Sequence, residues 1–144
     1  MKLNGTHKFK ASSQQVYNAI LSPQILKKCI PGCDSVEFLD ANRIKANITT
    51  PLPGFKGPYG AVIYIAQRQE PSLLVLELQR KGAAGAINAT SSINIIDEVD
   101  GALLTYNATA DLEGPIAMAD NPLGQGVTRK SLGKFFENLD KVMA

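Results

Sequence analysis

Alternation of apolar and polar residues predicts a strand at the start of the chain. Over residues 3–10, Leu3, Gly5, His7 and Phe9 fall on one face, while lysine, asparagine and threonine fall on the other. A period of two is that of a strand with one buried face. The histidine is therefore expected to face inward.

Two short helices are expected next. Ser12 and Gln15 fit a capping box ahead of the first helix. Ser22 can cap the second helix, which carries Pro23 at its first position, where the missing amide hydrogen costs nothing. Pro31-Gly32 ends this helix.

The middle of the chain predicts a meander of six strands separated by turn signals. The expected strands cover residues 36–39, 43–50, 60–69, 73–81, 86–96 and 102–112. The proline- and glycine-rich segment 51–58 cannot hold a central strand, so we expect a loop there at the mouth of a cavity.

From about Pro122 onward the apolar residues recur at helical spacing, opposite a basic face. A curved antiparallel sheet must cover one of its faces, and this long helix is the element available to do so. The expected fold is therefore α+β in a single domain over residues 1–144. It consists of one strand, two short helices, six strands and a long C-terminal helix on which a sheet of about seven strands is wrapped.

Composition narrows the function classes. The chain has 144 residues, of which 44% are hydrophobic, and this suffices for one domain with a substantial core. The net charge of +2 is too small to indicate nucleic-acid binding. No secretory signal and no run of about 18 apolar residues is found, so a cytoplasmic location is expected.

Candidate chemistry is sparse. Cys29 and Cys33 cannot form a zinc site alone, because zinc takes about four ligands and His7 lies on another element. His7 is the candidate acid or base near neutral pH, and a satisfied core histidine is the simpler interpretation. No nucleophile elbow or phosphate loop is present. We therefore predict no catalytic residue, no metal and no cofactor.

Alanines on the inward face of the last strand leave space beneath the sheet. Either bulky residues of the C-terminal helix fill this space, or an apolar cavity remains for a ligand. The sequence leaves both alternatives open. The candidate lining residues are His7, Ile44, Ile48, Tyr64, Leu76, Leu78, Tyr106, Ala108, Ala110, Phe135 and Phe136.

One motif carries a family resemblance. The run Lys28-Cys29-Ile30-Pro31-Gly32-Cys33 follows a strand and two helices, and the glycine-marked segments at 57–60, 81–86 and 105–114 follow in order. This arrangement resembles the CoxG family of carbon monoxide dehydrogenase proteins, which belongs to the START and birch-pollen-allergen-like helix-grip superfamily. The resemblance covers nearly the whole chain.

The resemblance implies non-catalytic binding of a hydrophobic, quinone- or lipid-like molecule between the sheet and the last helix. It also implies partnership with an aerobic carbon monoxide dehydrogenase or a related molybdenum hydroxylase, at the inner face of the membrane. Many members carry a tail for membrane attachment, whereas this sequence ends at Ala144, so we expect a soluble carrier or assembly factor.

Two alternatives remain open. The same superfamily includes cyclases and hydrolases, and an enzyme would depend on His7, Tyr64 or Tyr106. A protein-interaction subunit with a filled core would instead make contact through the 51–58 loop and the basic face of the last helix.

Overall fold

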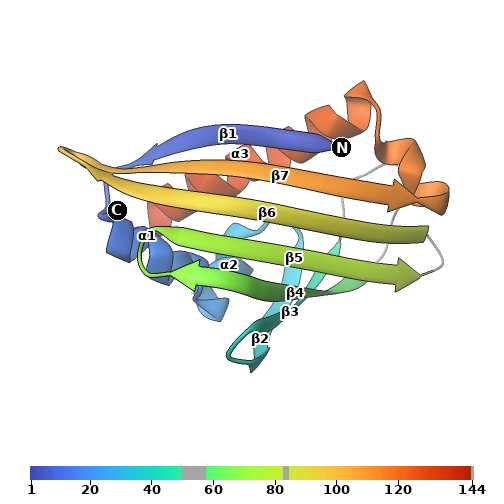
Figure 1. Ribbon diagram of the computed structural model, residues 1–144, viewed down its shortest axis with the longest axis horizontal. Coiled ribbons are helices and arrows are strands. Elements are labelled where there is room, and N and C mark those ends of the chain that lie inside the picture. Colours follow the sequence, from blue (N-terminus) through green and yellow to red (C-terminus); the bar gives the residue numbers. More distant parts are fainter. Residues whose placement is uncertain (50–57, 83–84, 144) are drawn as a thin grey trace.

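A computed structural model describes residues 1–49, 58–82 and 85–143, and it shows one curved antiparallel sheet backed by helices (Figure 1). The seven strands lie in the order β1-β7-β6-β5-β4-β3-β2. Their bounds are Lys2–Phe9 (β1), Cys33–Asp40 (β2), Arg43–Thr49 (β3), Pro58–Gln69 (β4), Leu73–Gly82 (β5), Gly85–Glu98 (β6) and Gly101–Glu113 (β7). The helices are Ser13–Ile20 (α1), Pro23–Cys29 (α2), the 3-10 helix Gly114–Ala119 (η1) and Pro122–Met143 (α3).

Both short helices begin as the sequence predicts. The Ser12 side chain accepts a hydrogen bond from the Gln15 amide, and the Gln15 side chain accepts one from the Ser12 amide at 3.0 Å, which completes the capping box. The hydroxyl of Ser22 accepts a hydrogen bond from the Ile25 amide at the start of α2. These bonds satisfy amide groups that the first turn of a helix leaves free.

The turn after α2 explains the glycine of the Ile-Pro-Gly-Cys motif. Gly32 has a φ of +74°, and a Cβ atom placed on it would lie 2.3 Å from the carbonyl oxygen of Thr49. Because any larger residue would collide with β3 and strain the backbone, this position requires glycine. The motif thus brings α2 back against the sheet.

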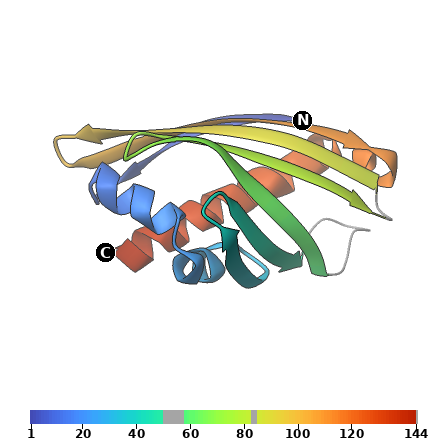
Figure 2. The ribbon, with the colours of Figure 1, turned by 60° about the horizontal axis from the view of Figure 1, so that its bottom comes forward.

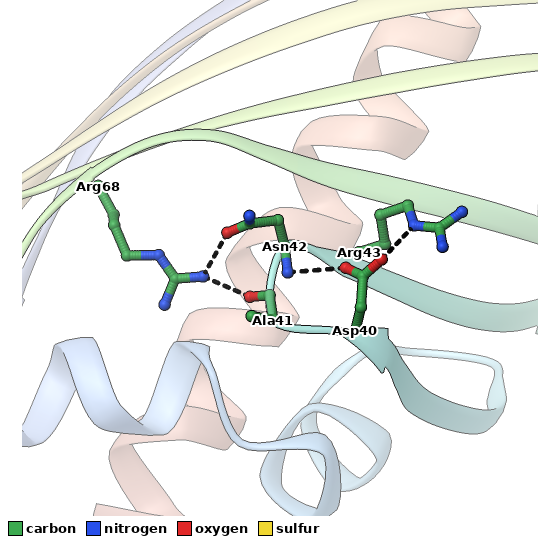
Figure 3. A network of polar contacts seen from close by, with 5 residues as sticks. All are labelled: Asp40, Ala41, Asn42, Arg43 and Arg68. Atoms are coloured by element: carbon green, nitrogen blue, oxygen red, sulfur yellow. Dashed lines mark hydrogen bonds and ion pairs between the residues drawn. The ribbon is translucent and has the colours of Figure 1, made fainter.

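The β2–β3 hairpin is closed by a polar network (Figure 3). The Asp40 carboxylate accepts hydrogen bonds from the Asn42 amide at 2.9 Å and from Nε of Arg43 at 2.7 Å. Arg68 of β4 donates to the Ala41 carbonyl and to Oδ1 of Asn42. The hydrogen bond from the Asn42 amide, followed by that from Arg43, lowers the pKa of Asp40. Because these charged and polar groups bind one another, the network stabilises the hairpin and its contact with β4.

The three α-helices lie on the concave side of the sheet, with α3 running obliquely beneath it (Figure 2). Buried side chains from the sheet, α1, α2 and α3 form one core. Its larger members are Phe9, Val16, Tyr17, Ile20, Ile44, Ile65, Leu74, Ile95, Leu104, Phe136 and Leu139. The predicted helix-grip architecture is therefore confirmed.

The structure differs from the sequence-based prediction in detail. β6 and β7 extend beyond their expected ends, and the 3-10 helix η1 follows β7. Six residues without apolar periodicity give no sequence signal for such a helix. The predicted strand end at residue 50, the expected loop at 51–57 and the turn residues 83–84 lie outside the described residues, while Pro58 begins β4. Among the described helices, none has both the length and the apolar character needed to cross a bilayer.

Candidate functional site

A cavity of about 230 Å³ lies on the concave face of the sheet, where β1 and β4–β7 run side by side. It is lined by Met1, Leu3, Ile63, Leu76, Glu77, Leu78, Ala89, Thr90, Ser91, Ala108, Thr109 and Ala110. The alternative of a completely filled concave face is therefore not what the structure shows.

The register of the strands explains this lining. Two rows of cross-strand neighbours form the floor. The first row is Leu3, Ala108, Ser91 and Leu76, and the second is Ala110, Ala89, Leu78 and Ile63. Three alanines and a serine thus stand next to one another on β6 and β7, so no long side chain fills the volume above them.

The floor is almost entirely apolar. Glu77, Thr90 and Thr109 alternate with floor residues along their strands, so they belong to the outer face of the sheet. Ser91 is half-buried in the inner row, with Leu76 and Ala108 as its register partners. Ser91 therefore provides the floor with a hydroxyl.

His7 lies in the packed region beside the cavity. Its Nε2 atom lies 2.8 Å from Oδ2 of Asp140, a contact that joins β1 to α3. The imidazole stacks on Phe136 at 5.1 Å between ring centroids and meets the edge of Phe9 at 4.6 Å. A hydrogen-bonded histidine enclosed by aromatic rings fits the interpretation of a satisfied core residue.

Tyr106 also packs beside the cavity. A Cβ atom on Gly5 would lie 2.7 Å from the Tyr106 hydroxyl oxygen, so the missing side chain of this glycine gives the tyrosine room. The Tyr106 ring lies 5.7 Å from that of Phe136. Tyr106 thus fills the space between β1 and α3 next to the cavity.

The predicted lining residues divide into three groups. Those on the cavity floor are Leu76, Leu78, Ala108 and Ala110. Those in or against the adjacent packed core are His7, Ile44, Tyr106, Phe135 and Phe136. Ile48 shares the inward face of β3 with Ile44 and Ala46 but lies outside the lining.

Tyr64 requires a correction, because it lies on the outer face of the sheet. It is 47% exposed and pairs with Arg43 and Glu77, while its neighbour Ile63 lines the cavity. Sequence reasoning also missed Ala89 and Ser91. Alternation along 86–96 carried that signal, because both residues share a face with the buried Ile95.

The cysteines show no binding geometry. Cys29 is fully buried and Cys33 is half-buried, and both are free thiols. Burial raises the pKa of the Cys29 thiol and that of Cys33, which favours the neutral form. Within the described residues, no group of three or more histidine, cysteine or acidic side chains is placed to hold a metal ion.

The curved sheet, the long helix beneath it and the apolar cavity between them define a helix-grip protein of the START and birch-pollen-allergen-like class. The model of the carbon monoxide dehydrogenase family CoxG matches residues 5–144, and the chain belongs to this family. This family and fold are generally associated with ligand binding. A comparison with curated proteins gave no match.

Solved structures confirm the fold. A conserved protein from Geobacillus kaustophilus is 28% identical, with a TM-score of 0.88 over 98% of this chain and 93% of its own. Ara h 8.0201 is 14% identical, with a TM-score of 0.70 over 99% of this chain and 96% of its own. The di-domain ARO/CYC StfQ of the steffimycin biosynthetic pathway is 10% identical, with a TM-score of 0.72 over 97% of this chain and 50% of its own.

Proposed function

We propose that this protein binds a hydrophobic small molecule, quinone- or lipid-like, in the cavity on the concave face of the sheet. The observation that carries the proposal is a cavity of about 230 Å³ with an apolar floor in a domain whose remaining interior is packed. Protein interiors are normally filled to crystal-like density, so a void of this size suits a ligand.

The chemistry of the floor supports an apolar ligand. Its inward side chains are leucine, isoleucine and alanine, with one serine. Small-molecule sites are typically apolar with a few polar groups that fix orientation. A ligand that is largely hydrocarbon and carries few oxygen atoms matches this surface.

The placement of the candidate acid–base groups supports binding without catalysis. His7 is held by Asp140 and lies outside the cavity lining. Tyr64 lies on the outer face of the sheet, and Tyr106 is packed against Phe136. A general acid or base must come within hydrogen-bond reach of the reacting group, and these positions supply no such group on the floor.

Membership of the CoxG family supports a setting for this binding. We propose that the protein acts in the cytoplasm, peripheral to the inner face of the membrane, as an accessory or assembly factor. Its partner in this proposal is an aerobic carbon monoxide dehydrogenase or a related molybdenum hydroxylase. The basic residues of α3, such as Arg129, Lys130 and Lys134, offer a surface for acidic lipid or protein.

Native mass spectrometry of the gently purified protein, followed by organic extraction, tests the binding proposal. The wild type should carry, or take up when offered, one quinone or lipid molecule. Ala110→Trp places a large ring on the cavity floor and should abolish this uptake while thermal unfolding stays cooperative. Asn107→Trp, on the exposed outer face of the same strand, is the matched control and should bind as the wild type does. Wild-type protein that is empty and refuses both quinones and lipids would favour an interaction subunit instead.

A further inference from the structure

We infer that the hydroxyl of Ser91 determines ligand specificity: it selects apolar molecules that carry a carbonyl or hydroxyl oxygen over pure hydrocarbons. The inference rests on the proposed binding function and deepens it.

Ser91 occupies the middle of the first row of the cavity floor. Its register partners are Leu76 on β5 and Ala108 on β7, and both of these side chains also line the cavity. Leu3 completes the row on the far side of Ala108. The serine hydroxyl is thus surrounded by hydrocarbon on the floor and faces the volume that a ligand would occupy.

The hydroxyl is also available. Within the part of the chain that the structure describes, Ser91 makes no side-chain hydrogen bond to another protein group. Tyr106, another hydroxyl-bearing residue of this face, directs its oxygen over Gly5 and lies outside the lining. Ser91 therefore stands as the polar group of the floor itself.

The energetics turn this placement into selectivity. When a ligand covers the floor, Ser91 loses its hydrogen bonds to water, and a hydrocarbon ligand gives nothing in return. A ligand oxygen within reach restores one hydrogen bond at this point. The hydrogen bond therefore separates two otherwise similar ligands, because its absence leaves a desolvated hydroxyl unpaired.

The chain provides a matched control in the next residue. Ser92 points to the opposite face of β6, where its register partners are Val75 and Asn107. Ser91→Ala and Ser92→Ala remove the same atom from adjacent positions of one strand. Ser91→Thr keeps a hydroxyl at the cavity and serves as the conservative variant.

Binding of 1-tetralone and of tetralin to the full chain, measured by calorimetry or by NMR titration, tests the inference. These two probes share their rings and differ by one carbonyl oxygen. Ser91→Ala should lower the tetralone-to-tetralin affinity ratio by roughly threefold to tenfold, the range expected for one neutral hydrogen bond. Ser92→Ala and Ser91→Thr should leave the ratio within about twofold of that of the wild type.

Three outcomes would overturn the inference. An unchanged ratio in Ser91→Ala, or an equal change in Ser92→Ala, would show that the hydroxyl does not read the ligand. A parallel loss of both probes in Ser91→Ala, with unaltered thermal unfolding, would assign the serine to cavity shape rather than to hydrogen bonding. If the wild type binds neither of these probes nor any quinone or lipid, the proposed function fails together with the inference.

Discussion

The glycines of α3 provide a quantitative test of the structure. Gly124, Gly126 and Gly133 all lie within this helix of 22 residues. Glycine in a helix interior is less favourable than alanine by about 1 kcal/mol, chiefly because its backbone loses more conformational freedom on folding. Replacement by alanine should therefore stabilise the protein wherever the added methyl group has room.

The three positions differ sharply in that room. A Cβ atom on Gly126 or on Gly133 would meet no heavy atom within 4 Å. A Cβ atom on Gly124 would lie 1.9 Å from the carbonyl oxygen of Ala119 and 2.8 Å from its carbonyl carbon. These are backbone atoms of η1, so they cannot move aside without displacing the start of α3.

We therefore expect opposite signs within one helix. Gly133→Ala should raise the free energy of unfolding by about 0.5–1 kcal/mol, which corresponds to a rise in Tm of about 2–4 °C for a domain of this size. Gly126→Ala should act in the same direction. Gly124→Ala should lower the free energy of unfolding by about 1–3 kcal/mol, the usual cost of overpacking.

Urea and thermal unfolding, followed by circular dichroism, measure all three variants and the Gly126→Ala/Gly133→Ala pair. The two exposed sites are about 10 Å apart along the helix axis, so their effects should add. A destabilised Gly133→Ala together with a neutral Gly124→Ala would refute the described packing of α3 against η1.

Two further predictions concern titratable groups. The Ser13 amide and hydroxyl each donate to the Asp97 carboxylate at 2.8 Å, and these bonds lower the pKa of Asp97 in the folded state. Asp97 therefore contributes stability above its unfolded pKa of about 4, and this is lost as pH falls through the lower folded pKa. Asp97→Asn should flatten the acid limb of stability measured by urea unfolding, and an unaltered limb would contradict this. Among the thiols, native protein should be alkylated at the half-buried Cys33 well before the fully buried Cys29, which should react only on unfolding. Equal labelling rates by peptide mass spectrometry would be inconsistent with that burial.

Local patterns predicted the elements well because their causes are local. The capping box at Ser12 and Gln15 and the period of two in β1 each depend on residues that are near one another in sequence. The inward direction of Ala108 and Ala110 followed in the same way from alternation along the last strand. These residues lie on the cavity floor.

The placement of Tyr64 depended on information that alternation does not carry. β4 contains a register shift between Ile65 and Gln67 relative to β5. Beyond the shift, Arg68 pairs with the buried Leu74, so the inward positions change from odd to even numbers. A slip of one residue moves every side chain to the other face. Tyr64 precedes the shift and therefore faces outward.

The helix residues lie outside the cavity lining for a different reason. Helical periodicity placed Phe135 and Phe136 on the apolar stripe of α3, but it does not say which part of the sheet each residue meets. That depends on the oblique course of α3 beneath the sheet (Figure 2). In the structure, Phe136 meets His7, Phe9 and Tyr106 instead of the alanines of β7.

Side-chain size along β6 and β7 thus determines where the domain is packed and where it is hollow. Toward the hairpin that joins these strands, the inner face carries Ile95 and Leu104, and both are buried in the core. Toward the opposite end it carries Ala89 and Ala110, which pair with each other on the cavity floor. Because the small residues of the two strands are in register, their missing volumes combine into one space. The cavity is therefore a consequence of sequence and register together, and the serine on its floor is the feature that gives the space chemical direction.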